Sequence, residues 1–166
     1  TEARIWRQIG ALALVDGSRD AIIAYRRAAE LEPENPEGQM LVGVLQLRSG
    51  NLGAAEQAFR RQIELAQSDK SAHVRYRGRT MLGDVCAARH APEEALSAYQ
   101  EAQKEINGLL EETPGHATYR RDLSVTFDRI GDILFSRGDL DGALESYQKG
   151  GVEIIETLPL GREFGT

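Results

Sequence analysis

The stretch GDLDGALESYQ, residues 138–148, places a small residue, Ala143, four positions before an aromatic one, Tyr147. The same pairing recurs three times upstream, at Ala21/Tyr25, Ala55/Phe59 and Ala95/Tyr99. An apolar residue followed by glycine precedes each pair, and these glycines are Gly10, Gly43, Gly83 and Gly131. The glycine stands 11 residues before the first alanine and 12 before each of the others. Such regular spacing indicates a structural unit repeated four times.

Apolar residues inside each unit follow a helical period. Leu123, Phe127, Ile130 and Leu134 recur at intervals of three and four residues, which places them on one face of a helix. Turn-forming residues separate such segments at positions 16–18, 49–51, 90–92 and 137–139. We therefore expect eight helices and no strand, near residues 2–15, 19–31, 36–48, 52–67, 70–89, 92–112, 115–137 and 140–158.

The packing of two antiparallel helices explains the small residues. We expect each glycine and alanine to lie where the two backbones approach closely, with the aromatic projecting past this contact toward the following unit. A helix pair of this size cannot bury its apolar face alone, so neighbouring units must stack. The alternative is an ordinary helical bundle in which the alanines coincide by chance.

These residues resemble the tetratricopeptide repeat. The first unit is the most similar, with Trp6, Gly10, Ala21, Tyr25, Ala28 and Pro33 at the signature places. The second unit has Gln62 at the place of a small residue, and the third has Arg79 at the place of an aromatic. The resemblance implies an all-α fold, a right-handed α-solenoid of four antiparallel helix pairs. It also implies one domain over 1–166, with repeats at 2–35, 36–68, 69–113 and 114–158 and a tail at 159–166.

The later units are longer than the usual repeat. Successive glycines are 33, 40 and 48 residues apart, and a turn at Thr113–Gly115 leaves a helix of roughly 21 residues on each side, about two turns more than usual. Two whole turns preserve the buried face, so the apolar stripe continues through Ile106, Leu109 and Leu110. The stretch 121–148 resembles the long repeats common in bacterial signalling and effector proteins. Because the chain begins at Thr1, we expect it to be a fragment of a longer protein.

Composition excludes several classes of function. Twenty basic and 26 acidic residues give a net charge of −6, which argues against nucleic-acid binding. No apolar run is long enough to insert into a membrane. The single cysteine, Cys86, excludes an internal disulfide and fits a cytoplasmic location. We expect it to pack between helices as a small apolar residue.

No pattern of catalytic or metal-binding residues is present. His73, His90 and His116 do not pair with each other or with Cys86 at metal-ligand spacing, and the chain has no phosphate-binding loop or nucleophile motif. The sequence therefore predicts a protein that is not an enzyme and needs no cofactor. In HVRYRGR, residues 73–79, Arg75 and Arg79 share a helix face and Arg77 does not. Either this is a solvated helix surface, or Arg77 contacts a carboxylate or phosphate.

The resemblance implies that the first helix of each pair lines a concave groove. The candidate groove is basic at the first repeat, apolar at the second and acidic at the fourth, and its residues are Arg4, Arg7, Met40, Val44, Leu47, Arg77, Asp84, Asp128, Asp132 and Phe135. Some family members hold a C-terminal carboxylate in a polar clamp. The corresponding positions here are Arg7, Ala11, Leu41, Arg77 and Met81, of which only two are basic, so that ligand is disfavoured.

We consider three functions. The first is a non-catalytic protein–protein interaction module that binds a peptide or protein segment in the groove. The second is self-association through the faces of the terminal helices, including a homodimer through the C-terminal helix. That helix carries Tyr147, Val152, Ile154, Ile155 and Leu158, so we expect a second copy, further repeats or the tail (through Leu160 and Phe164) to cover it. The third is a regulatory domain of a larger signalling enzyme.

Overall fold

The chain folds into α-helices alone over the residues described by the computed structural model, 1–15, 20–67 and 71–157. In this part of the chain the eight helices are α1 (Glu2–Val15), α2 (Asp20–Leu31), α3 (Pro36–Arg48), α4 (Leu52–Leu65), α5 (Ala72–Ala88), α6 (Pro92–Glu112), α7 (Ala117–Ser136) and α8 (Leu140–Thr157). Each boundary lies within two residues of the position expected from the sequence.

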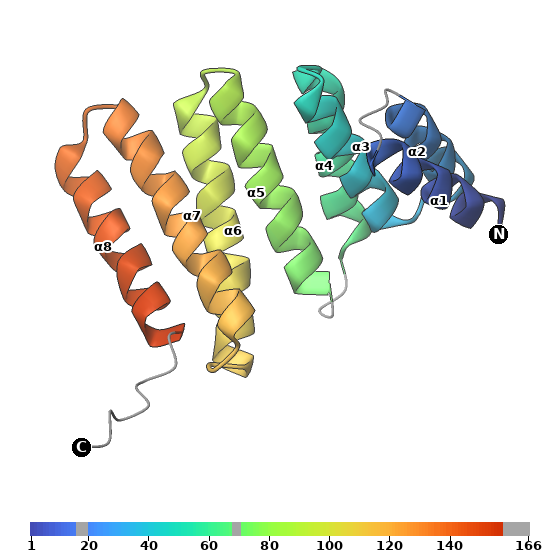
Figure 1. Cartoon of the computed structure of the whole chain (residues 1–166). Helices are drawn as coiled ribbons and strands as arrows, with labels where there is room; N and C mark the ends of the chain where they lie inside the picture. Colours follow the sequence, from blue (N-terminus) through green and yellow to red (C-terminus); the bar gives the residue numbers. More distant parts are fainter. Residues whose placement is uncertain (16–19, 68–70, 158–166) are drawn as a thin grey trace.

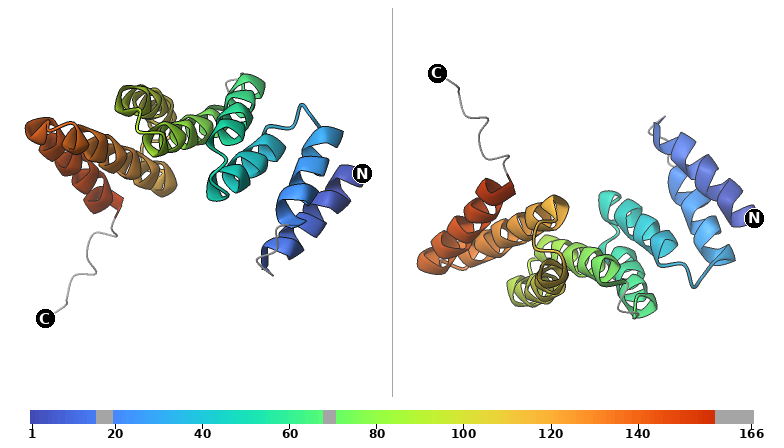
Figure 2. Two further views of the ribbon diagram at one scale, coloured as in Figure 1. Left: turned by 90° about the horizontal axis from the view of Figure 1, so that it is seen from above. Right: turned by 90° about the horizontal axis from the view of Figure 1, so that it is seen from below.

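The helices form four antiparallel pairs that stack in one row, an α-solenoid (Figure 1). Each helix packs most extensively against the other member of its pair, and α2, α4 and α6 also pack against the first helix of the following pair. The pairs α1/α2 and α7/α8 lie at opposite ends of the row, and views from above and below show the same order (Figures 1 and 2). The 21 residues of α6 and the 20 of α7 confirm the lengthened helices and the turn between them.

The helix ends follow local sequence signals. The side chain of Asn35 caps α3 by accepting hydrogen bonds from the backbone N–H groups of Glu37 and Gly38, and Pro36 occupies the first turn. Gly50 and Gly138 adopt φ of +76° and +83°, the left-handed conformation expected after a helix. His90, with φ of +58°, takes the same conformation between α5 and α6. The turn expected at 16–18 lies outside the described residues.

The repeated spacing of glycine and aromatic has a reason that differs from the expected one. A Cβ atom added to Gly43 or Gly131 would lie 2.5 Å from the ring of Phe59 or Tyr147, and the rings of Tyr25 and Tyr99 crowd Gly10 and Gly83 in the same way. Each glycine therefore makes room for the aromatic ring of its own pair. The four alanines that precede the aromatics are fully buried, as expected.

The rings also reach the following pair, as the sequence predicts. Phe59 packs in one cluster with Val85 of α5, and Tyr99 packs with Ile130 and Ile133 of α7. Around the α6–α7 turn the apolar stripe continues as expected, with Ile106 fully buried and Leu109 and Leu110 packed beside it. A continuous core therefore runs through successive pairs.

Gln62 shows how a departure from the repeat pattern is accommodated. This side chain is fully buried at the place of a small residue, and its Nε2 donates to the carbonyl of Val74 at 3.3 Å. On the facing helix α5, a Cβ at Gly78 would lie 2.8 Å from Ile63 and 3.3 Å from Oε1 of Gln62. The glycine thus supplies the volume that the glutamine takes, although Gln62 Oε1 accepts no hydrogen bond.

Candidate functional site

The first helices of the last three pairs share a surface, here named the α3/α5/α7 face. A pocket of about 200 Å³ opens on it, and its lining residues are Met40 from α3, Tyr76, Arg77, Thr80 and Met81 from α5, and Asp122, Val125 and Arg129 from α7. Met40 and Arg77 were expected in the groove from the sequence. The face therefore brings residues from three repeats to one small cavity.

The apolar candidates of the second repeat belong mainly to the core. Met40 is buried with Phe59 and Val85, and the half-buried Val44 and Leu47 pack against the same cluster. Only Met40 of the three lines the pocket. The accessible apolar groups on this face instead come from α7, where Val125 and Phe135 are exposed.

Asp84 is held in a polar network between the third and fourth pairs. Its Oδ1 accepts from the Tyr99 hydroxyl at 2.7 Å and from Arg129 Nε at 2.8 Å, and its Oδ2 accepts from Arg129 Nη2 at 3.1 Å. Burial and the adjacent Asp84 carboxylate raise the pKa of Tyr99. Asp84 is thus already neutralised by Arg129, a residue that sequence reasoning missed because nothing in the repeat pattern marks it.

Asp128 and Asp132 are two exposed carboxylates on α7. Asp132 accepts from the Tyr147 hydroxyl at 2.7 Å, and that hydrogen bond raises the pKa of Tyr147. Partial burial, and then the charge of Asp132, raise the pKa of Asp128. Neither carboxylate forms an ion pair with a described residue. Their mutual repulsion would be relieved by a cation bound there.

The arginines expected in the groove are only partly available to bind a partner. Arg7 pairs with Glu32 at 2.6 Å and its hydrogen bond lowers the pKa of that carboxyl group. Arg77 forms a longer contact with Glu37, 3.4 Å, in which both side chains are exposed. Arg4 is exposed on α1.

Comparison with known proteins finds a family match over part of the chain and similar folds among solved structures. The family described as tetratricopeptide repeat matches residues 15–72, which include α2, α3 and α4. Among solved structures, MamA of MSR-1 is 15% identical, with 92% of this chain and 77% of that chain covered and a TM-score of 0.61. MamA of AMB-1 is 16% identical, with 95% and 75% covered and a TM-score of 0.59. At such identities the likeness is one of fold. No curated protein matches the sequence.

Residues 15–72 match the tetratricopeptide repeat. The described helices before and after this segment continue the same row of antiparallel pairs. Tetratricopeptide repeats are generally scaffolds for protein interactions. None of the described helices is both long enough and apolar enough to cross a membrane.

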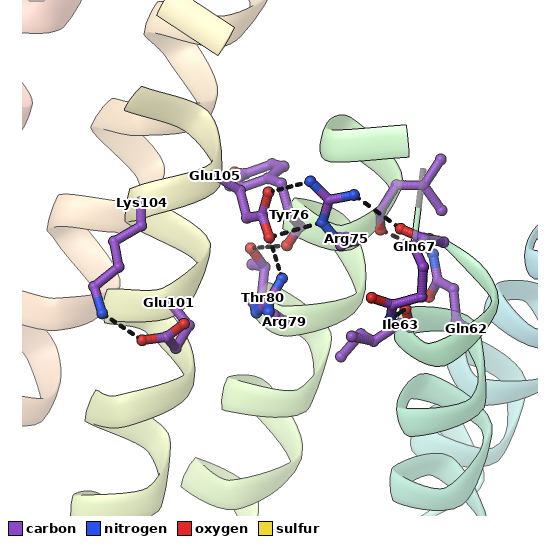
Figure 3. A network of polar contacts seen from close by, with 12 residues as sticks. Gln62, Ile63, Gln67, Arg75, Tyr76, Arg79, Thr80, Glu101, Lys104 and Glu105 are labelled. Carbon is purple, nitrogen blue, oxygen red and sulfur yellow. Dashed lines mark hydrogen bonds and ion pairs between the residues drawn. The ribbon is translucent and has the colours of Figure 1, made fainter. Parts of the chain in front are cut away.

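The basic run at residues 73–79, on α5, is structural. Arg75 and Arg79 share a face, as expected, but this face turns toward α6, where both guanidinium groups bind the carboxylate of Glu105 (Figure 3). Arg75 also donates to the carbonyl of Ala66 at 2.9 Å. The three charged groups are largely buried, so a solvated helix surface is wrong for this pair. Arg77 points elsewhere and lines the pocket.

The remaining candidate groups have structural surroundings. Cys86 packs between helices, as predicted, beside a pocket of about 520 Å³ among α4, α5 and α6, and burial and the nearby Glu94 raise the pKa of its thiol. His73 lies 3.1 Å from Asp122, and His116 caps α7 by accepting from the N–H of Tyr119. Over the described ranges, no three His, Cys, Asp or Glu side chains form a group that could hold a metal ion.

Proposed function

We propose that the chain is a non-catalytic protein-interaction module that binds a peptide or protein segment on the α3/α5/α7 face. The pocket of about 200 Å³ supports this proposal most directly, because Met40, Met81 and Val125 give it an apolar lining at the meeting point of three repeats. Pockets of this kind accept one apolar side chain of a bound segment, while the surrounding polar groups fix its register.

The charges on the face suggest the polarity of the segment. Asp84 is neutralised by Arg129, so the uncompensated negative charge lies at Asp128 and Asp132. We propose that basic side chains of the partner contact these two carboxylates. At the other end of the row, Arg4 is the exposed cation that suits an acidic side chain, because Arg7 is already paired with Glu32.

The remaining expected groove residues take supporting parts in this proposal. Arg77 can exchange its exposed contact with Glu37 for a partner's carboxylate, and Phe135 extends the apolar surface along α7. Met40 lines the pocket, and Val44 and Leu47 pack against the core cluster that contains Met40. We also propose a cytoplasmic location, since the only cysteine is a buried free thiol.

A substitution in the pocket tests the site. A random peptide library displayed on phage supplies a probe, and fluorescence anisotropy measures the affinity of the selected peptide. Val125→Glu should weaken binding at least tenfold, because it places a charge in the apolar lining. The matched control is Gln57→Glu on α4, exposed and away from the α3/α5/α7 face. Equal affinity for the wild type and Val125→Glu would place binding elsewhere.

Charge reversal tests whether basic side chains of the bound segment contact Asp128 and Asp132. Asp128→Lys combined with Asp132→Asn removes the acidic site while leaving an amide oxygen to accept from Tyr147. A selected peptide with basic residues should then bind several-fold more weakly, mainly through a slower association rate and more at low salt. Asp141→Lys on α8 reverses a charge off this face and should leave the rate nearly unchanged. A loss of affinity independent of salt would contradict the electrostatic contact.

Self-association is the second candidate function. Leu140, Leu144 and Val152 are exposed on α8, which supports a role for the last helix in contacts between chains. The side chains of Ile154, Ile155 and Leu158, and the tail residues Leu160 and Phe164, lie outside the described part, so the expected cover over this face stays a prediction.

A further inference from the structure

Equivalent positions in the four pairs reveal an apolar contact that is made three times inside the molecule. The residue two positions after each signature glycine is Leu12, Leu45, Val85 and Ile133. Leu45 packs in a cluster with Tyr25, Val85 packs with Phe59, and Ile133 packs with Tyr99. In each case the first helix of one pair inserts this residue against the aromatic ring of the preceding pair.

Both halves of the same contact are open at the two ends of the row. Leu45, Val85 and Ile133 are 0–8% exposed, whereas Leu12 is 69% exposed. Ile5 and Ile9 are exposed beside it on α1, at positions where Thr126 and Ile130 are buried in the fourth pair. At the opposite end Tyr147 is 37% exposed, although Tyr25, Phe59 and Tyr99 are at most 6% exposed, and Leu144 lies beside it at 57%.

The two open faces carry the two halves of one apolar contact, and the helices that bear them differ in net charge. One face presents the inserting residue and the other the receiving ring, so the chain carries both sides of its own internal joint. Helices α1 and α2 hold four arginines against three acidic residues, a balance of +1, and α8 holds one lysine against four acidic residues, a balance of −3. This opposite net charge of the helices at the two ends favours their encounter.

The hydrogen bonds of Asp84 and Asp132, at equivalent positions of consecutive pairs, also differ between the inside and the end of the row. Inside the molecule Asp84 accepts from Tyr99 and also from Arg129 of the next pair. Asp132 accepts from Tyr147 in the same way, and no following pair among the described residues offers it a second donor. The position equivalent to Arg129, two residues before the signature glycine, is the exposed Gln8 on α1, whose amide can donate to a carboxylate.

We propose that copies of this chain associate head to tail, with α1 of one copy docked on the α7/α8 end of another. Leu12 inserts against Tyr147 and Leu144, and Gln8 meets Asp132, as the equivalent residues do between consecutive pairs. Such a contact joins two different surfaces, so it propagates the solenoid into an open assembly instead of closing a two-fold dimer. This goes beyond binding on the α3/α5/α7 face: the contact leaves the pocket of that face open and shares only Asp132 with the proposed acidic site.

Two single substitutions and their mixture test the proposal by sedimentation velocity. The wild-type chain should gain mass as its concentration rises. Leu12→Asp blocks one face and Leu144→Asp blocks the other, so each variant alone should remain monomeric. An equimolar mixture contains one intact pair of faces and should form a species of twice the monomer mass and nothing larger.

A matched control separates the interface from general hydrophobicity. Ile23 is 63% exposed on α2, but the equivalent positions in the other pairs are the polar residues Gln57, Ser97 and Glu145, so it belongs to an ordinary outer surface. Ile23→Asp should assemble like the wild type. A wild-type chain that stays monomeric at every concentration, a Leu12→Asp variant that still dimerises, or a mixture that does not associate would each overturn the proposal. Binding of the phage-selected peptide should be unchanged in Leu12→Asp, which keeps the two functions distinguishable.

Discussion

Single residues set the packing of every helix pair through the contact between a glycine and an aromatic ring. The ring of Phe59 lies where a side chain at position 43 would begin, and the same holds for Tyr147 and Gly131. The ring can then remain in contact with both its own pair and the next one. Glycine destabilises a helix interior relative to alanine, so it is favoured here by packing alone.

Alanine substitutions separate packing from helix propensity. Gly43→Ala should lower the free energy of unfolding by about 1–3 kcal/mol, because the new methyl group meets the Phe59 ring at 2.5 Å. Gly108→Ala, inside α6 with no atom near the added Cβ, should raise it by about 0.5–1 kcal/mol through helix propensity. Urea unfolding of both variants measures the difference. Stabilisation of both proteins would show that the ring moves aside freely.

At the scale of helices, the repeated spacing was sufficient to predict the elements. It could not predict which of their residues are buried and which can contact a partner. The period of three and four residues and the turn signals predicted all described helices, including the lengthened α6 and α7. The pattern could not tell that Val44 and Leu47 pack into the core, because one apolar stripe serves both packing and binding. It also missed Arg129, since the pairing with Asp84 depends on how two repeats are placed in space.

The exposed apolar face of α1 could have been predicted from the sequence, but it was not. Ile5, Ile9 and Leu12 form a helical stripe, and comparison of Leu12 with Leu45, Val85 and Ile133 marks it as a residue that packs elsewhere in the chain. Position within the row, not residue type, determines that it is exposed. Aligning the units by their glycines would have supplied this signal.

The alanines between paired helices provide a test at the same scale. Ala95→Leu should lower the free energy of unfolding by about 1–3 kcal/mol, because the side chain is fully buried beside Tyr99 and Cys86 and has no space to grow. Ala117→Leu, exposed at the first residue of α7, is the matched control and should change stability by less than about 0.5 kcal/mol. Thermal melts in which the two variants agree would show that the α5/α6 contact adapts without strain.

At the scale of the whole molecule, the local stability of each helix pair depends on its position in the row. In repeat proteins each unit is stabilised by its own core and by its neighbours, so units with fewer contacts open first. Helix α1 packs chiefly against α2 and buries only Ala3 and Gly10. Helix α6 packs against α5 and α7 and buries five residues, among them Ala102 and Ile106, which are fully inaccessible.

Native-state hydrogen exchange should follow this order. Amides in α1 should exchange fastest among the described helices and those in α5 and α6 slowest, because local opening of α1 exposes little additional apolar surface. The head-to-tail contact adds a second expectation, since it covers the outer face of α1. Protection in α1 should therefore rise with protein concentration in the wild type and stay constant in Leu12→Asp, whereas protection in α6 should change in neither. Uniform exchange across the row would mean that the chain opens as one cooperative unit, and the positional account of its stability would be wrong.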